Sequence, residues 1–318
     1  MADRKRLLLH IGTNKTGSSS LQALMARERK ALAARKICYP LTDRPPFPNR
    51  RKHLNFWRAL KAGSEGFQQE RELLLAEFAA SGADTLVLSE EHLSQTGLRI
   101  DDAMRDLADR FEIEVLCFLR RQDRYLESWW SQRCKTGRET LHIDAFVRSR
   151  TALARINYLA LLEYWAGFAR VTAIGFEQAC KIGLTRSFNK ATGLDLPEET
   201  HRRNVSPSAR TSAILAGLNG LGEAHDWASI EAARKGPKSP YALGAGLRAE
   251  ILRQCAEQNA ELAERHAVVF PKDMPEEPPD PIAAPTCDEL ESFRSRAPGR
   301  ARAPGRKKRA PASPGKDG

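Results

Sequence analysis

The chain has few cysteines and none of the spacings that make cysteine informative. Its six cysteines are scattered over 318 residues, with no Cys-x-x-Cys pair and no regular Cys/His spacing. Structural zinc sites and disulfide frameworks depend on such spacings, so the sequence predicts neither and no bound metal. Reduced thiols are the default for such a chain, and we therefore expect a cytoplasmic protein.

Long hydrophobic runs are also missing. No apolar stretch approaches the roughly 20 residues that a membrane-spanning helix needs. The apolar run near the N-terminus stops at Ile11, which is too short for a signal peptide, and no small-residue cleavage site follows it. We expect no membrane span and no secretion signal, while the residues predict no particular oligomeric state.

Basic residues outnumber acidic ones, but the excess is concentrated at one end. Of the formal net charge of +11, residues 294–318 supply +8, with nine Lys or Arg and one Asp. From Pro271 onward the composition is dominated by Pro, acids, Arg, Ala and Gly, which cannot bury a core. We therefore predict one domain over residues 1–270 and a disordered Pro/Arg-rich tail over residues 271–318.

The body of the chain alternates short apolar runs with segments of helical spacing. Strands are expected at Leu7 to Ile11, Asp84 to Ser89, Glu114 to Leu119 and Val171 to Phe176, with a shorter one within Arg35 to Tyr39. Helices are expected between them, for example over residues 101–111, 123–133 and 156–168, and again over residues 247–266. This alternation predicts an α/β protein with a central parallel sheet covered on both faces and a helical C-terminal part. Ligands bind such sheets beyond the carboxyl ends of the strands.

One polar loop joins the first strand to the first helix. Gly12 and Gly17 supply conformational freedom, Lys15 supplies charge, and small hydroxyl side chains follow where a helix would begin. The first turn of a helix has unpaired N–H groups and partial positive charge, so this loop predicts an anion site. The alternative is an ordinary capped helix in which Lys15 is simply solvated.

The loop lacks the lysine of the Walker pattern, because Ser18 stands where that lysine belongs. The order Lys-Thr-Gly-Ser-Ser instead resembles the phosphosulfate loop of sulfotransferases that use 3′-phosphoadenosine 5′-phosphosulfate (PAPS), in particular bacterial, carbohydrate-type members. That resemblance implies a three-layer fold like that of P-loop NTPases. It assigns cofactor binding to Asn14, Lys15, Thr16, Gly17, Ser18, Ser19 and Ser20.

A second motif follows the third expected strand. Arg120 ends that strand, and Ser128 follows eight residues later on the next helix. This spacing resembles the sulfotransferase element that holds the 3′-phosphate of PAPS, since a guanidinium and a hydroxyl both donate to phosphate oxygens. A surface arginine cluster is the alternative. Arg203, in a late basic segment, resembles a residue that closes over the nucleotide.

The third motif, Ser89-Glu90-Glu91-His92, resembles the segment that supplies the catalytic base in carbohydrate sulfotransferases. On that register Glu91 is the base, because an attacking hydroxyl must lose its proton to a positioned group. Glu90 and His92 are competitors, and His53 is a further catalytic candidate near the acceptor. Acids are also favoured at any helix N-terminus, which is the structural alternative.

Taken with the resemblance, these motifs imply transfer of a sulfuryl group from PAPS to a hydroxyl of a carbohydrate or glycolipid. Lys15 would stabilise the leaving phosphate, and no metal would be required. One alternative is a nucleotide kinase of P-loop type. Another is a non-enzymatic nucleic-acid-binding protein that uses the basic tail, although a single aromatic residue, Phe293, lies in residues 272–318.

Overall fold

The computed structural model describes residues 4–40, 51–62, 64–95, 100–198, 206–223, 225–236, 238–272 and 281–294. Five parallel strands form one sheet in the order β2-β3-β1-β4-β5. They are β1 (Lys5–His10), β2 (Ile37–Cys38), β3 (Thr85–Ser89), β4 (Phe111–Leu119) and β5 (Arg170–Gly175). The predicted parallel sheet is confirmed, and β1, which carries the polar loop, lies at its centre.

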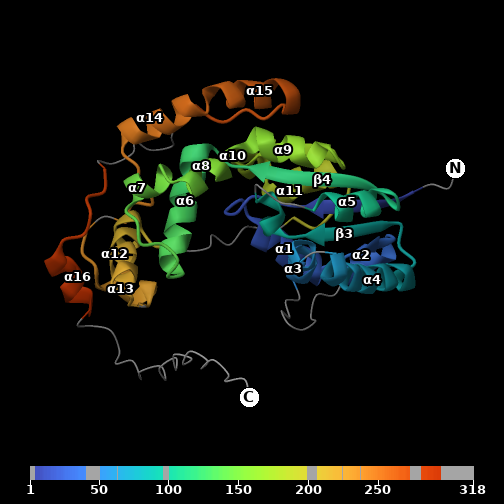
Figure 1. The fold of residues 1–318 in the computed structure, drawn as a ribbon, viewed down its shortest axis with the longest axis horizontal. Helices are drawn as coiled ribbons and strands as arrows, with labels where there is room; N and C mark the ends of the chain where they lie inside the picture. The colour runs from blue at the N-terminus through green and yellow to red at the C-terminus, as the bar shows by residue number, and fades with distance from the viewer. Residues whose placement is uncertain are drawn as a thin grey trace, which may run out of the picture.

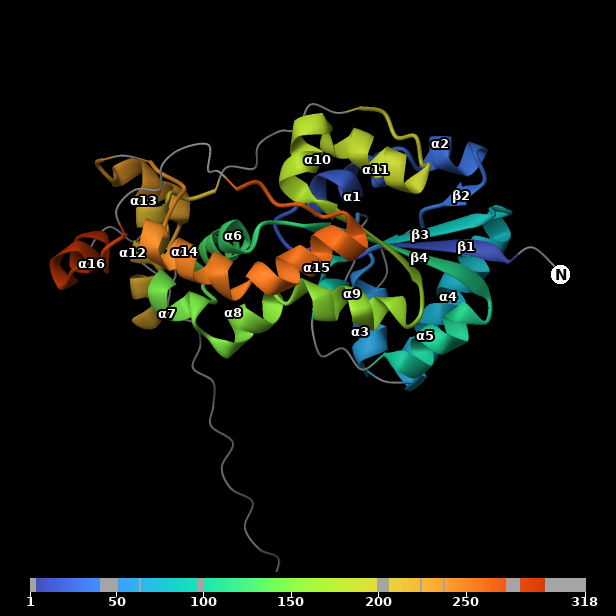
Figure 2. The same ribbon diagram turned by 90° about the horizontal axis from the view of Figure 1, so that it is seen from above.

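Alternation of side chains along β1 explains why both faces of the sheet are covered. Leu7 and Leu9 pack into the hydrophobic cluster on one face, whereas Leu8 packs into the cluster on the other. One face carries α1 (Ser18–Arg27), α2 (Arg29–Ala34), α10 (Phe176–Ile182) and α11 (Leu184–Thr192). The other carries α3 (Leu54–Ala62), α4 (Ser64–Ser81), α5 (Asp101–Ala108), α9 (Tyr158–Ala166) and α15 (Ala256–His266) (Figure 2). These are the three layers expected from the sequence.

A group of helices extends beyond the carboxyl edge of the sheet, on the left in Figure 1. It consists of α6 (Gln122–Lys135), α7 (Ile143–Val147), α8 (Arg150–Arg155), α12 (Ala209–Gly220), α13 (Trp227–Ala233), α14 (Ala245–Gln254) and α16 (Cys287–Arg294). We call this group the helical lobe. It has a hydrophobic cluster of its own, in which Trp130, Leu126 and Ile214 are fully buried. The lobe supplies one wall of the site described below.

Several element boundaries differ from the expectation. The helix predicted over residues 101–111 ends at Ala108, and Phe111 instead begins β4, paired with Lys5 of β1. The single helix predicted over residues 247–266 is two helices, α14 and α15, which meet at Cys255. In both cases the apolar spacing continues past the end of the helix, so periodicity alone does not reveal where the helix ends.

The expectation of disorder from Pro271 onward is wrong for residues 281–294. Within this segment α16 packs on α12, and Phe293 is buried in the hydrophobic cluster of the helical lobe. Arg210 of α12 also bonds to Glu289 of α16, with Nε 3.1 Å from Oε1. A few apolar residues in a segment rich in Pro and charge are enough for docking when an existing core offers a surface.

Candidate functional site

The loop after β1 has a tight, specific conformation. Gly12, Lys15 and Gly17 have positive φ angles of 55°, 68° and 79°. Thr16 is fully buried, and its hydroxyl donates to the carbonyl of Thr13 at 2.7 Å while accepting the Thr13 N–H at 3.3 Å. The side chain of Thr16 therefore closes the loop from within. A left-handed conformation is costly for Lys15 and indicates that the loop holds this residue in place.

The backbone N–H groups at the N-terminus of α1 are not occupied by a capping side chain from the described residues. Its N-cap residue is Gly17, no side chain caps it, and its first turn contains no acid. Ser18 and Ser19 face the cavity described below, and the Ser18 hydroxyl is buried with no hydrogen-bond partner among the described residues. A Cβ at Gly12 would lie 2.5 Å from that hydroxyl, so glycine is required there. The end of α1 thus presents unpaired donors to an anion.

Arg120 meets this loop although it lies 105 residues further along the chain. Its Nη1 donates to the backbone carbonyl of Lys15 at 3.2 Å, and its guanidinium lies over the ring of Phe176, 5.7 Å from the centroid. Its Nε is buried, lies 4.0 Å from Oε1 of Glu177 and makes no hydrogen bond to any residue that the structure describes. Burial, with Arg124 adding repulsion, lowers the pKa of Arg120 despite the nearby carboxylate of Glu177.

The pKa of Lys15 is also lowered, as that of Arg120 is. Burial lowers its pKa, and the charges of Arg120 and Lys135 lower it further. Its Nζ donates weakly to Oε1 of Gln132, at 3.4 Å. Two partly desolvated cations held beside one another favour a bound anion, which would relieve both.

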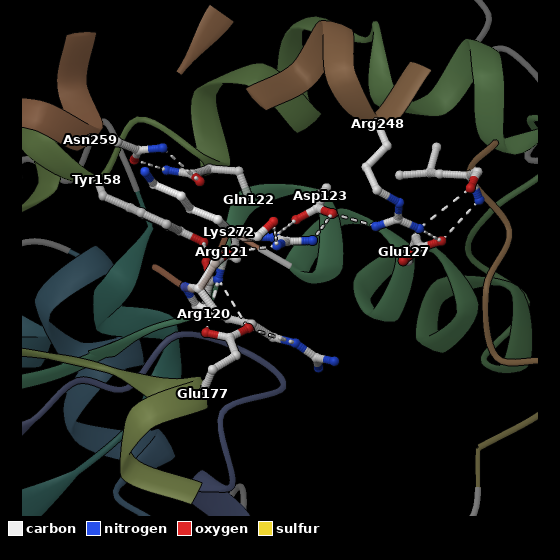
Figure 3. A network of polar contacts seen from close by, with 12 residues as sticks. Arg120, Arg121, Gln122, Asp123, Glu127, Tyr158, Glu177, Arg248, Asn259 and Lys272 are labelled. Carbon is white, nitrogen blue, oxygen red and sulfur yellow. Dashed lines mark hydrogen bonds and ion pairs between the residues drawn. The ribbon is translucent and has the colours of Figure 1, made fainter. Parts of the chain in front are cut away.

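Hydrogen bonds to the backbone on either side of the peptide bond after Arg120 fix the position of this residue (Figure 3). The hydroxyl of Tyr158 donates to the carbonyl of Arg120 at 2.7 Å, and the carboxylate of Glu177 accepts the next N–H, that of Arg121, at 3.2 and 3.3 Å. Tyr158 and Glu177 were not predicted from the sequence. Neither lies in a recognisable motif, because their role depends on the packing of α9 and α10 against the end of β4.

A cavity of about 1090 Å³ is lined by residues from all three predicted motifs. It lies between the carboxyl edge of the sheet and the helical lobe. Asn14, Lys15, Gly17, Ser18, Ser19, Arg120, Ser128 and Glu91 line it among the predicted residues. Other lining residues include His92, Gln95, Arg124, Glu127, Trp129, Gln132, Arg133, Lys135, Arg138, Arg155, Phe176 and Ser206. Thr16 and Ser20 are not among them, although both belong to the loop and the first turn of α1.

The segment after β3 divides into one buried acid and two residues that face the cavity. Glu90 is fully buried, and its Oε1 accepts both the N–H of His92, at 3.1 Å, and Nδ1 of the same histidine, at 2.5 Å. Glu91 accepts from Nε2 of Gln22 at 3.1 Å and lies 3.5 Å from Nζ of Lys52. Glu91 and His92 therefore line the cavity, and Glu90 orients His92 from behind.

His53 lies elsewhere. It is buried, its Nδ1 accepts the N–H of Ser89 at 2.9 Å, and its own N–H donates to the Ser89 carbonyl at 3.0 Å. It is not among the cavity-lining residues and ties the start of α3 to the end of β3. Arg203 lies outside the described residues, so only Ser206 of that late basic segment is seen at the cavity.

The cavity wall is strongly basic. Among the lining residues are seven cationic side chains, Lys15, Arg120, Arg124, Arg133, Lys135, Arg138 and Arg155, against two carboxylates, Glu91 and Glu127. This excess favours a ligand with several negative charges. Five of the seven, Arg124, Arg133, Lys135, Arg138 and Arg155, were not singled out from the sequence, because only the fold brings α6, its following turn and α8 to this cavity.

The chain was compared with family models, curated proteins and solved structures. No family model and no curated protein matches the chain. Its fold is similar to a crystal structure of a sulfotransferase from Alicyclobacillus acidocaldarius, with 16% identity and a TM-score of 0.47 over 85% of this chain and 98% of that one. This likeness carries no statement about activity.

The described part of the chain has neither a membrane-spanning helix nor a cluster of metal-ligating side chains. None of its helices is both long and apolar enough to cross a membrane. The same residues contain no group of three or more His, Cys, Asp or Glu side chains that could hold a metal ion.

Proposed function

We propose that the protein is a sulfotransferase that moves a sulfuryl group from PAPS to a hydroxyl of a carbohydrate or glycolipid. The contact between Arg120 and the carbonyl of Lys15 carries the proposal. It joins the loop motif and the Arg-x7-Ser motif, which are far apart in the chain, at one cavity. A donor with both a 5′-phosphosulfate and a 3′-phosphate needs two such anion sites side by side.

The residues present fit that donor. Backbone N–H groups of residues 16–19 would hold the 5′-phosphate at the uncapped end of α1, where Asn14 and the hydroxyls of Ser18 and Ser19 offer further polar groups. The N–H of Ser20, which the resemblance also assigns to this phosphate, donates instead to the carbonyl of Gly17 at 3.0 Å. Arg120 and Ser128 would hold the 3′-phosphate. Within the described residues Nε of Arg120 makes no hydrogen bond, although it lies 4.0 Å from Oε1 of Glu177. We assign Arg203 to closure over the nucleotide on its resemblance alone.

In the reaction, the acceptor oxygen forms a bond to sulfur while the bond between sulfur and the bridging phosphate oxygen breaks. The electron pair of that bond stays on the bridging oxygen, giving adenosine 3′,5′-bisphosphate and a sulfate ester. Lys15 would stabilise the charge that grows on the bridging oxygen. Arg120 and Ser128 would fix the orientation of the donor for in-line transfer.

Glu91 would accept the proton of the attacking hydroxyl, since its carboxylate lines the cavity. His92 is the competitor that the geometry favours most, because Glu90 holds its Nδ1 and leaves Nε2 to act as a base. Glu90 and His53 are buried away from the cavity lining, which argues against direct proton transfer by either.

Calorimetric titration of adenosine 3′,5′-bisphosphate, with AMP and ATP as controls, tests the donor site. We expect clear preference for the bisphosphate in the native protein. Arg120→Ala should weaken its binding roughly 10- to 100-fold, as expected for loss of a charged hydrogen bond to phosphate, and should reduce the preference over AMP. Arg120→Lys is the matched control that keeps charge but loses the planar donor pair.

Equal binding of the bisphosphate and AMP would overturn the proposal, and preference for ATP would favour the kinase alternative. Lys15→Ala should lower kcat and should weaken binding of the bisphosphate more than binding of PAPS, since the bridging oxygen gains its charge as the bond to sulfur breaks and keeps that charge in the product.

The base is identified by comparing Glu91→Gln with His92→Asn in an assay of PAPS turnover. Loss of the base should lower kcat about 10²- to 10⁴-fold and remove the acidic limb of the pH profile, with bisphosphate binding unchanged. A large effect confined to His92→Asn would move the role from Glu91 to the His92–Glu90 pair.

A further inference from the structure

The cavity contains more cationic side chains than the donor needs. PAPS carries about four negative charges near neutral pH. Lys15, Arg120 and Arg124, together with the end of α1, lie where that donor is proposed to bind. Arg133, Lys135 and Arg138 line the cavity from the C-terminal end of α6 and the turn after it, and Arg155 lines it from α8.

The acids near the cavity do not neutralise these cations. Glu127 accepts from Nη2 of Arg248 at 2.8 Å and from the N–H groups of Ala242 and Leu243 at 2.8 and 2.9 Å. Glu91 is engaged by Gln22 and Lys52. Both lining carboxylates are therefore bound to groups other than the four cations.

Of the four cations, only Arg133 has a carboxylate partner within the described residues, Glu139, with Nε 2.7 Å from Oε2. Arg155 makes a long contact of 3.4 Å to the amide oxygen of Asn14. For Lys135 and Arg138 the described residues provide no ion pair. Three positive charges at one wall of the cavity thus lack an acid.

Aromatic rings hold two of these cations in place. The ammonium of Lys135 lies 4.2 Å from the centroid of Trp227, and the guanidinium of Arg155 lies 5.1 Å from that of Trp129. Trp129 is also approached by Arg133, at 5.4 Å. Such contacts reduce the freedom of long side chains without neutralising them. The charges are therefore positioned before any ligand arrives.

We propose that the acceptor is an anionic glycan, whose carboxylate or phosphate groups bind Lys135, Arg138 and Arg155 while its hydroxyl faces the donor. This inference rests on the proposed function and adds the charge class of the acceptor. Its rival is that cations at the C-terminal end of α6 merely complement the helix dipole, in which case they need no ligand.

The test measures binding of two matched pairs of glycans to the protein saturated with adenosine 3′,5′-bisphosphate. The first pair is unsulfated chondroitin and its carboxyl-reduced form. The second is a phosphorylated lipooligosaccharide and its dephosphorylated form. We expect an anionic member to bind at least 10-fold more tightly than its neutral counterpart, and the pair that responds distinguishes carboxylate from phosphate.

The variant Lys135→Gln/Arg138→Gln should weaken that binding about 10- to 100-fold. Lys30→Gln/Arg253→Gln removes the same charges from exposed positions outside the cavity and should change it less than 2-fold. The control variant should bind the bisphosphate as the native protein does. The cavity variant should lose less affinity for the bisphosphate than for the glycan, because the charge of Lys135 also acts on Lys15. Absence of binding in both pairs, equal binding within each pair, or equal loss in the two variants would overturn the inference.

A failure of the donor site is distinguishable from these outcomes. It would appear as missing bisphosphate binding in the native protein, before any glycan is added. The acceptor inference can therefore fail while the donor proposal stands.

Discussion

His10 illustrates how burial controls a single ionisable group in this chain. It ends β1, with its ring edge-on to Phe118 and Phe188 at centroid distances of 6.0 and 5.5 Å, and its Nδ1 lies 2.8 Å from the hydroxyl of Ser89. Its Nε2 is buried and has no hydrogen-bond partner in the described part of the chain. Burial lowers the pKa of His10 from 6.5 to about 4, although the charge of Glu91 opposes the shift. The imidazole is therefore neutral in the folded protein near pH 7.

This shift predicts a loss of stability on mild acidification. The unfolded chain binds a proton at His10 near pH 6.5, whereas the folded chain does so only near pH 4. The contribution of His10 to the free energy of unfolding is therefore fully present above pH 6.5 and falls as pH drops from 6.5 to 4. At pH 5 the free energy of unfolding should be about 2 kcal/mol lower than at neutral pH. Urea unfolding of native protein and His10→Asn at pH 7 and pH 5 measures it. An equal pH dependence in both proteins would contradict the prediction.

Helix α6 belongs to the helical lobe and begins two residues after Arg120, so it connects the lobe to the site (Figure 3). Arg121, just before α6, forms two 2.8 Å hydrogen bonds to the carboxylate of Asp123, and Arg248 of α14 bonds to both Asp123 and Glu127. Burial would raise the pKa of Asp123, but the two arginines outweigh it and the pKa is lowered. The N-terminal half of α6 is thereby fixed beside Arg120.

Removing Arg248 should leave the buried carboxylate of Glu127 without its arginine, while Asp123 keeps Arg121. We expect Arg248→Met to lower the free energy of unfolding by about 3–5 kcal/mol, because no opposite charge would then offset the desolvation cost of Glu127. Equilibrium urea denaturation at pH 7 measures this. Arg248→Met/Glu127→Gln, which also removes the charge of Glu127, should recover part of the loss. A loss below about 1 kcal/mol in the single variant would show that water already solvates the network.

At the scale of the whole molecule, the position of α16 decides where the tail can be removed. Arg294 is the last described residue and α16 ends there. We expect a chain truncated after Arg294 to keep the unfolding temperature and the bisphosphate affinity of the full chain. Truncation after Lys272 should lower the unfolding temperature, because Phe293 and Leu290 would leave the hydrophobic cluster of the helical lobe.

The same truncation tests the nucleic-acid alternative. Gel-shift titration of the full chain and of the chain ending at Arg294, with double-stranded DNA and single-stranded RNA at physiological salt, separates the two functions. Binding that disappears with the tail while bisphosphate binding persists would assign the tail a separate role. Loss of both ligands on truncation would contradict the separation.

Much of the fold was predictable because its signals are local. The run Leu7 to Ile11, the glycines at positions 12 and 17 and the hydroxyls after them specify a strand, a turn and a helix within about 20 residues. Alternation of such units predicts a parallel sheet, and a parallel sheet places Lys15, Arg120 and Glu91 at one edge. The sequence therefore anticipates which motifs meet.

The fold alone decided the remaining features, because they depend on contacts between distant segments. The docking of α14 determines that Arg248 bonds to Asp123 and Glu127, and the packing of α9 and α10 directs Tyr158 and Glu177 to the end of β4. His53 has the residue type of a catalyst, yet its neighbours in space make it a buried clamp on Ser89. Residue type and spacing determine local conformation, but burial and partners are properties of the assembled core.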